Sequence, residues 1–542
     1  MQTNCFKLHL RKLSSQASIL KIFCSFFLLL FVCSISNQAQ TKCFSEDEKK
    51  RIIESISTPQ KIKDLKSIRS ELTKLDSDRK SLENSILSEK NNTELLAKRR
   101  SLLNGGIQRL CTIFKENGWL NKEALGQEVF SAEIDLIFNV DEPNIQREFL
   151  PILLAAAEKG EVKRADIATL VDSIRVKSGM TQLFGTYLAF NDGIVYLYPL
   201  ENEKMVDEWR KLYELPTLNS FMRDIETKYQ TLVVKRDSPK KNPVVAKTDT
   251  KVLGLDDDSD VIKVSTNLVN VKVRIIADNK QSQVLNLGAK NFALTEDDKP
   301  QEISFFEKDA KPIDYYLVLD LSGSTARIRE TIWNTVGILA KLLRPSDRIT
   351  VATHIDNNLH TILDLTSNQN NISEMVSQFR GLGSSSIWDA LNDTYDLTEK
   401  QNFKNRGAVM ILITDGIETD SKIAFGNLLN RVKENEITIF PIQLPTDYLE
   451  EDPTASKKRL SVATRALELL AGESGGEYFN IRKDSELLSI PEKIINGLGE
   501  IYNLGFEPAN TNFDGSWRRL KVKLANRNDF RVRAKTGYYA KP

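Results

Sequence analysis

The pattern of hydrophobic and polar positions changes along the chain. In residues 61–103 apolar side chains recur every three or four positions, which is typical of an amphipathic helix or a coiled-coil seam. From Val261 the period becomes two, as in strands with one buried face. After residue 313 short apolar runs alternate with helix-like segments. This alternation predicts a doubly wound α/β domain, a sheet covered by helices on both faces.

The expected strands of the α/β domain are Tyr315–Leu319, Ile349–Thr353, Thr361–Leu365, Val409–Thr414, Ile437–Ile442 and Tyr478–Ile481. The domain is flanked by period-two segments around 269–275 and 303–306 and by the segments 503–508, 517–525 and 530–540. Neither flank has enough strands to bury a core alone. We therefore predict that both flanks pair into one β-sandwich, with the α/β domain inserted between them.

The seam in residues 61–103 consists of Leu65, Ile68, Leu72, Leu75, Leu82 and Ile86, and it is interrupted by Arg79. Its length of about three heptads is sufficient for a helical hairpin or a weak dimer. A single long helix packed on its neighbour explains the pattern as well. Self-association through residues 61–103 therefore stays one of several interpretations.

The composition is that of a globular protein, with 41% hydrophobic and 27% charged residues. The net charge of +1 includes the basic residues of an acid-free start, so the rest of the chain is slightly acidic and nucleic acid is not indicated as a partner. Residues 22–33, IFCSFFLLLFVC, are typical of a secretory signal peptide cleaved after Ala39. An uncleaved membrane anchor, or a lipoprotein modified at Cys33, are the alternatives. We expect a periplasmic, envelope-associated or secreted protein.

The positions of the cysteines are compatible with an exported protein but do not establish export. Only Cys43 and Cys111 follow the predicted signal, and they flank a long helical stretch. They form a disulfide if that stretch folds back, or they stay buried thiols. The sequence contains no C-x-x-C motif or Cys/His cluster, so zinc is not indicated.

Three oxygen-bearing turns follow expected strands or precede an expected helix. The first is Asp320-Leu321-Ser322-Gly323-Ser324, the second includes Ser385, and the third begins at Asp415. In open α/β sheets, ligands bind outside the carboxyl ends of the strands. Carboxylates and hydroxyls are the oxygen ligands that a hard divalent cation prefers. A cation held mainly by neutral hydroxyls can still attract a carboxylate from a partner.

These turns, in this order, resemble the metal-ion-dependent adhesion site of von Willebrand factor A domains. The resemblance implies Mg²⁺ or Mn²⁺ held by Asp320, Ser322, Ser324, Ser385 and Asp415, with Ser385 where the family usually has threonine. Residues 260–542, including NFALTEDDKPQEISFFEKD and LKVKLANRNDFRVRAKTGYYA, are similar to von Willebrand A-related proteins abundant in acidobacteria. The resemblance to the adhesion site also implies a protein ligand that binds through an acidic side chain.

A second resemblance covers about 110 residues before the linker. Phrases such as IQREFLPILLAAAEKGEV and YPLENEKMVDEWRKLYELP resemble an uncharacterised bacterial domain of helices with a small β-hairpin. Gln182, Gly185, Thr186, Asp207 and Arg210 match that domain. These side chains are also of the kind that satisfies turns and helix ends, so we assign them no chemistry.

Catalysis is not expected. No G-x-S-x-G motif surrounds Ser322 or Ser324, the histidines are His9, His354 and His360, and a phosphatase would need an aspartate where Ser322 stands. The leading hypothesis is a metal-dependent protein-binding module, with Trp388 at its surface or in the core. The alternative is a structural cell-envelope assembly protein with a non-adhesive A domain.

The expected organisation is a signal peptide (1–39), a helical or coiled-coil segment (41–104), a mostly helical domain (105–228), a linker (229–260), the first part of the β-sandwich (261–312), the von Willebrand A domain (313–502) and the second part of the sandwich (503–542).

Overall fold

The computed structural model describes residues 43–57, 62–88, 92–191, 193–236, 268–277, 287–309, 311–355, 358–380, 385–401, 406–445, 453–525 and 530–540. The expected signal peptide and most of the expected linker lie outside these residues. The chain divides into two compact units, Met1–Leu188 with Tyr198–Leu218, and Ala189–Leu197 with Asn219–Pro542. Within the described ranges, no helix combines the length and the apolar character needed to cross a membrane.

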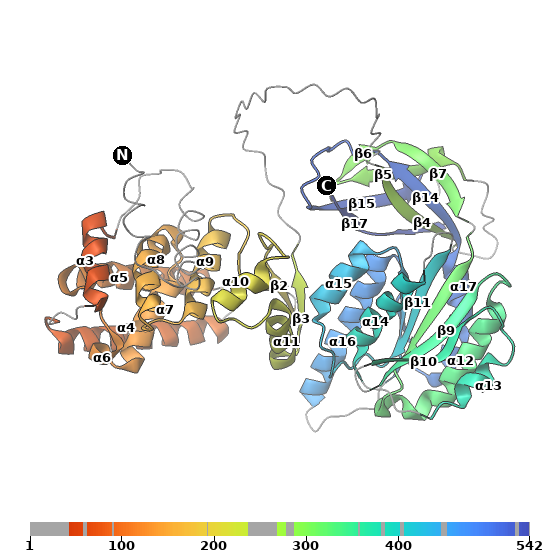
Figure 1. Ribbon diagram of the computed structural model, residues 1–542, viewed down its shortest axis with the longest axis horizontal. Helices are drawn as coiled ribbons and strands as arrows, with labels where there is room; N and C mark the ends of the chain where they lie inside the picture. Colours follow the sequence, from red (N-terminus) through yellow and green to blue (C-terminus); the bar gives the residue numbers. More distant parts are fainter. Residues whose placement is uncertain are drawn as a thin grey trace, which may run out of the picture. The chain divides into compact units, whose positions relative to one another are not determined.

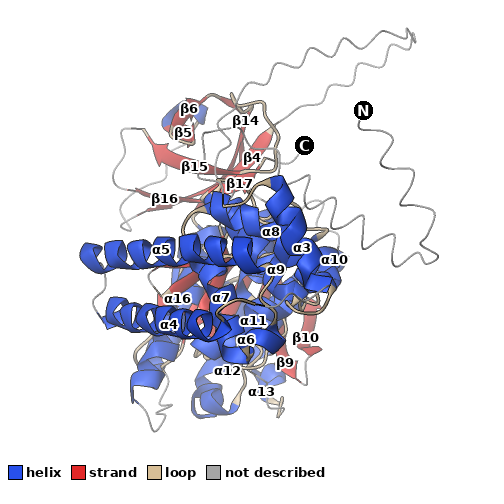
Figure 2. Ribbon diagram, turned by 90° about the vertical axis from the view of Figure 1, so that its left-hand side faces the viewer, coloured by secondary structure: helices blue, strands red, loops and turns tan. Residues whose placement is uncertain are grey.

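The first unit is helical. Its helices are α3 (Glu46–Ser57), α4 (Leu65–Ser88), α5 (Thr93–Asn117), α6 (Lys122–Leu125), α7 (Gln127–Asn139), α8 (Pro143–Glu158), α9 (Arg164–Lys177) and α10 (Val206–Leu212). Asn92 caps α5, because its side chain accepts hydrogen bonds from the N–H groups of Glu94 and Leu95. Helices α4 and α5 lie side by side as a hairpin (Figure 2).

The seam residues Ile68 and Leu72 are buried within this unit, with 4% and 3% of their surface exposed. Arg79, which interrupts the seam, is also buried and forms ion pairs with Asp76, Glu83 and Asp135. The first part of the seam therefore packs inside its own unit, in agreement with the hairpin interpretation, whereas Leu82 and Ile86 stay partly exposed.

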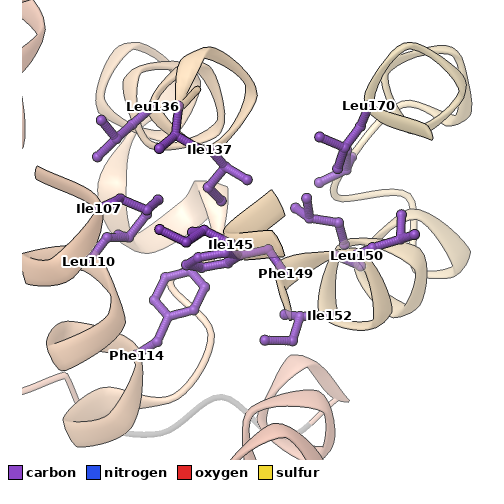
Figure 3. Close-up of a cluster of buried hydrophobic side chains, with 14 of the residues drawn as sticks. Ile107, Leu110, Phe114, Leu136, Ile137, Ile145, Phe149, Leu150, Ile152 and Leu170 are labelled. Atoms are coloured by element: carbon purple, nitrogen blue, oxygen red, sulfur yellow. The ribbon is translucent and has the colours of Figure 1, made fainter. Parts of the chain in front are cut away.

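One core joins the whole first unit, from Cys43 to Tyr213. Figure 3 shows its centre, where α5, α7, α8 and α9 contribute Phe114, Ile137, Phe149 and Leu170. The expected boundary between residues 104 and 105 falls inside α5 and is not a break in the structure. Gly106 does not end the helix. It lets α5 approach α4, since a Cβ there would lie 2.6 Å from a Leu75 methyl carbon.

Cys43 and Cys111 form a disulfide, with their Cα atoms 5.6 Å apart. It ties the segment before α3 to the last third of α5. The sequence left this pairing open, and the structure decides it in favour of the disulfide.

The second unit contains a six-stranded sheet made of β8 (Ile313–Leu319), β9 (Arg348–Ile355), β10 (Asn358–Thr366), β11 (Gly407–Thr414), β12 (Thr438–Gln443) and β13 (Phe479–Asn480). The order is β10-β9-β8-β11-β12-β13, and β10 is antiparallel to β9 while the other pairs are parallel. This is the order of a doubly wound fold. All six expected strands are present, with ends shifted by a few residues.

Helices cover both faces of this sheet (Figure 1). One core includes residues of α12 (Arg329–Leu342), α13 (Ile372–Ser377) and α17 (Ile490–Leu498), and the other includes α14 (Ile387–Lys400), α15 (Phe425–Glu434) and α16 (Pro453–Ser474). Alternate residues of β8 enter the two cores, Leu317 on the first face and Val318 on the second. Burial on both faces explains why β8 is a continuous apolar run.

The β-sandwich is built as predicted from both flanks. Its strands are β4 (Val269–Ala277), β5 (Phe292–Glu296), β6 (Lys299–Gln301), β7 (Ile303–Asp309), β14 (Glu500–Phe506), β15 (Trp517–Leu524), β16 (Phe530–Ala534) and β17 (Gly537–Tyr539). The sheets have the orders β16-β4-β14-β7 and β17-β15-β5-β6. Each sheet therefore combines strands from before and after the inserted domain, and one apolar core lies between them.

A small sheet with the order β1-β2-β3 completes the architecture, formed by β1 (Leu188–Asn191), β2 (Ile194–Leu197) and β3 (Leu232–Lys235). Helix α11 (Leu218–Tyr229) precedes β3. Ile194 and Leu232 belong to the core beneath α14, α15 and α16. The expected linker 229–260 therefore begins with a strand, because β3 finds its partner β2 about forty residues earlier in the chain and a buried place against the α/β domain.

Candidate metal centre

The first and third oxygen-bearing turns meet because their strands are neighbours. β8 and β11 are parallel, with Leu319 opposite Ile413, so Asp320 and the residues after Thr414 leave the sheet at the same edge. From β8 the sheet continues to β9 on one side, and from β11 to β12 on the other. This is the topological switch point, where a doubly wound sheet opens a crevice at the carboxyl ends of its strands.

In the first turn, Asp320 is 5% exposed and accepts hydrogen bonds through both carboxylate oxygens. Ser322 N–H donates to Oδ1 over 3.1 Å, and the Thr414 hydroxyl donates to Oδ2 over 2.7 Å. The hydroxyl oxygens of Ser322 and Ser324 are 3.0 Å apart. Ser324 is exposed, so this pair of hydroxyls extends from the buried carboxylate towards solvent.

In the third turn, Asp415 is 2% exposed and only half satisfied. Ile417 N–H donates to Oδ1 over 2.9 Å, whereas Oδ2 is buried and has no hydrogen-bond partner. Gly416 has a φ of +83°, and a Cβ there would lie 3.0 Å from the Cβ of Ala463. Glycine is therefore required for the tight turn that follows Asp415.

The second turn joins the third through backbone and carboxylate contacts. Thr419 N–H donates to the Ser385 carbonyl over 3.1 Å. Glu418 accepts hydrogen bonds from Ile387 N–H and Trp388 N–H over 2.7 and 3.2 Å, at the start of α14. Ser385 is half-buried, and residues 381–384 before it lie outside the described residues.

Electrostatics set these carboxylates apart. Burial raises the pKa of Asp320 to about 6, and the nearby negative charge of Asp415 adds to this rise. A buried carboxylate pair with an unpartnered oxygen is costly unless a positive charge compensates it. The donors present, carboxylate and hydroxyl oxygens, fit a hard divalent cation. In the described part of the chain, no group of three or more His, Cys, Asp or Glu side chains forms a metal cluster, so a cation here would depend on the hydroxyls.

Trp388 and His354, the two other candidates from the sequence, are both buried. Trp388 is 3% exposed and packs edge-on against Phe425, with ring centroids 5.1 Å apart, so it belongs to the core. His354 is 2% exposed, and its Nε2 lies 3.3 Å from Asp393 Oδ2.

The matched polar residues of the first unit satisfy backbone groups. Gln182 bonds the backbone of Tyr187 and Tyr198, and Asp207 accepts from Leu218 N–H. The centre of this cluster is Asp172, which the sequence did not single out. Its carboxylate accepts from the N–H groups of three later residues and from one hydroxyl, all in the segment 183–186.

Arg210, another matched residue, follows the same pattern. Its guanidinium donates to the carbonyls of Phe184 and Pro216.

Comparison with known families gives two matches. Residues 314–493 match the family described as von Willebrand factor type A domain. Residues 71–235 match a family of unknown function, DUF6624. No curated protein matches the sequence. The predicted likeness to acidobacterial proteins is not tested by these matches and stays a prediction.

The solved structures that match part of the chain include proteins of several bacteria. An aerotolerance-related membrane protein from Bacteroides fragilis is 13% identical, with a TM-score of 0.27 over 34% of this chain and 98% of that one. The vWF domain of the type V pili tip protein Mfa5 from Porphyromonas gingivalis is 12% identical, with a TM-score of 0.27 over 35% and 96%. A von Willebrand factor type A protein from Catenulispora acidiphila is 10% identical, with a TM-score of 0.30 over 51% and 75%.

Proposed function

We propose that this protein, which carries a von Willebrand factor type A domain after a DUF6624 domain, binds a protein partner through a divalent cation. Asp320, Ser322, Ser324, Ser385 and Asp415 would hold Mg²⁺ or Mn²⁺, in part through water. The observation that carries the proposal is the buried Oδ2 of Asp415, which has no hydrogen-bond partner and lies in the turn beside Asp320. When bound, the cation supplies a positive centre for an anionic oxygen of the partner.

The chain's own residues explain why a partner can reach this position. The two carboxylates are buried, whereas Ser324 is exposed at the mouth of the site. Three of the five proposed ligands are neutral hydroxyls, which leave the cation able to attract an acidic side chain. We place the protein among interaction modules and not among enzymes, and the pairing of the Ser322 and Ser324 hydroxyls with each other, 3.0 Å apart, supports this.

We further propose that the protein works outside the cytoplasm, either in the periplasm, at the envelope or after secretion. The predicted signal is one support. The second is the disulfide between Cys43 and Cys111, because such bonds persist in oxidising compartments.

The test begins with metal binding to the full chain. Calorimetric titration with Mn²⁺ should show one site in the wild type, and Asp320→Ala should weaken it at least tenfold. Asp364→Ala is the matched control, because Asp364 is an exposed aspartate on β10 of the same domain. A crystal soaked in Mn²⁺ should show anomalous density beside Asp320. An unchanged titration of the Asp320 variant would contradict the proposal.

Partner capture is the second step. Envelope extract should yield partners that the wild type retains in Mg²⁺ and releases in EDTA, and that Asp320→Ala does not retain. The structural alternative, an envelope assembly protein, predicts the reverse. It would give EDTA-insensitive partners and concentration-dependent assembly of the full chain in sedimentation velocity experiments.

A further inference from the structure

Helix α11 lies outside residues 314–493, yet it is bonded directly to the segment that follows Asp415. The side chain of Asn219 donates to the Lys422 carbonyl and accepts from Ala424 N–H, each over 2.8 Å. It also accepts from the Asn427 side chain over 2.8 Å. The start of α11 is therefore fixed to the start of α15.

Two glutamates, of which Glu226 is buried and Glu418 is largely buried, each cap a helix of the A domain. Glu418 accepts from the first two N–H groups of α14, which begins two residues after Ser385. Glu226, which comes from α11, accepts from Phe425 N–H, the first of α15, over 3.1 Å, and from Val233 N–H over 3.2 Å. Carboxylates are favourable at helix N-termini because they satisfy unpaired N–H groups and oppose the helix dipole.

Arg223 of α11 stands between these two carboxylates. Its guanidinium lies 3.2 Å from Glu226 and 3.7 Å from Glu418. The three side chains are 16%, 5% and 10% exposed, so little water screens the contacts. Removing the arginine would leave two buried carboxylates without their shared counter-charge, and such changes are strongly felt.

The segment around Glu418, which Arg223 contacts, is close in the chain to Asp415 and bonded to Ser385, two of the proposed ligands. Glu418 is three residues after Asp415, and Thr419 N–H holds the Ser385 carbonyl. A cavity of about 260 Å³ opens here, lined by Arg223 together with Gly416, Ile417 and Thr419. On the other side the packing is close, since a Cβ on Gly426 would lie 2.5 Å from the Val233 carbonyl oxygen. The segment 219–235 is thus closely packed against the start of α15, and beside the turn that carries Asp415 it lines this cavity.

We propose that Arg223 is a positioning residue for the metal centre, and that the docking of residues 219–235 is coupled to cation binding at Asp320 and Asp415. The inference rests on the proposed function. By linkage, the coupling is reciprocal: a docked α11 raises cation affinity, and a bound cation stabilises the docking of α11. The DUF6624 match ends at residue 235, so this contact lies between a segment of that match and the turn that carries Asp415.

The test compares Arg223→Met, which keeps the apolar stem, with Asp224→Asn, an exposed neighbour on the same helix. In the full chain we expect the methionine variant to bind Mn²⁺ about tenfold more weakly, and the control to bind as the wild type does. Hydrogen exchange supplies a readout that a purely structural role would not move. Mn²⁺ should slow exchange in residues 219–235 of the wild type but not of Arg223→Met.

Each outcome decides one question. If the wild type binds no Mn²⁺, the proposed function fails. If it binds Mn²⁺ and Arg223→Met binds equally well, the coupling is wrong while the proposed function stands. If the methionine variant does not fold, Arg223→Lys replaces it, with an expected loss of two- to fivefold, and wild-type affinity in that variant would overturn the inference.

Discussion

Asp172 in the helical unit and Asp415 in the A domain are both buried, with 0% and 2% of their surface exposed, but their surroundings differ. Both oxygens of Asp172 accept hydrogen bonds from the segment 183–186. Asp415 accepts one backbone bond, and its other oxygen has no partner. A buried carboxylate that is fully bonded serves the fold, whereas one left half bonded has room for a further partner such as the proposed cation.

Glu226 is a third case, a buried carboxylate bonded through both oxygens. It has backbone donors and an arginine, yet burial raises its pKa to about 7. Its contacts therefore do not fully offset the loss of water. The three residues differ in which groups compensate the buried charge, and this difference can be tested.

The largest effect should come from Asp172→Ala. The substitution leaves the N–H groups of Leu183, Phe184 and Thr186 without their acceptor, at a cost of about 3–5 kcal/mol. Hydrogen exchange in residues 164–187 should lose protection by that amount, while peptides of β11 stay unchanged. Asp172→Asn, which keeps one acceptor oxygen, should lose less. If Asp172→Ala lowered the free energy of unfolding by less than about 1 kcal/mol, Asp172 would not be a residue that stabilises the fold.

The next effect concerns pH and Glu226. Its pKa in the folded state, about 7, is above the ordinary value of 4.5, so the folded state holds the proton more tightly. The stability from this group is present at low pH and is lost as the pH rises from about 4.5 to about 7, by about 3 kcal/mol. Glu226→Gln cannot ionise at this position.

The measurement is the free energy of unfolding of the second unit across this pH range, by denaturant-dependent hydrogen exchange. The wild type should lose about 3 kcal/mol relative to Glu226→Gln as the pH rises. Arg223 and Glu418 are present in both proteins, so the difference between the two profiles reports the ionisation of Glu226 together with its coupling to these neighbours. If the unfolding free energies of the wild type and Glu226→Gln changed with pH in parallel, ionisation of Glu226 would not destabilise the folded state.

Asp415→Asn should behave in the opposite way to Asp172→Ala. It keeps an acceptor for Ile417 N–H and removes an unpartnered buried charge, so stability without metal should change by less than about 1 kcal/mol. Mg²⁺ at about a hundred times its dissociation constant should stabilise the wild type by about 2.7 kcal/mol and leave the variant unaffected. A thermal shift with Mg²⁺ in the variant would contradict the assignment.

The smallest effect should come from Ser385→Thr. The added methyl group limits the rotamers of the hydroxyl, so Mn²⁺ affinity should rise two- to threefold, or about 0.5 kcal/mol. Calorimetric titration of the full chain measures this change. A weaker affinity would show that the half-buried pocket around Ser385 has no room for the methyl group.

Much of the fold was predictable, because strands buried on both faces leave continuous apolar runs such as Tyr315–Leu319. The incomplete flanks predicted the sandwich, and the topology confirms it. The segment 530–540 was harder. It forms two strands in different sheets, with Gly537 in close contact with the Arg518 carbonyl, and alternation alone does not reveal such a corner.

The candidate site was predictable in part for a related reason. Residues that follow neighbouring parallel strands meet at one sheet edge, so Asp320 and Asp415 could be paired from the sequence. Arg223, Glu226 and Glu418 could not, because their pairing depends on how α11 packs against a segment about two hundred residues later. Asp172 lies in a helix whose sequence, IATLVDSIRV, gives no sign of what the carboxylate bonds. The ligand roles and the predicted signal stay predictions.

The inserted arrangement of the A domain has a consequence for proteolysis. The chain enters the domain after β7 and leaves it before β14, and these two strands are paired, with Ile501 opposite Asp309. Since each sandwich sheet holds strands from both sides of the insertion, one protease cut between residues 313 and 498 would not separate the fragments. They would migrate as one particle until denatured, and only a pair of cuts could release the domain.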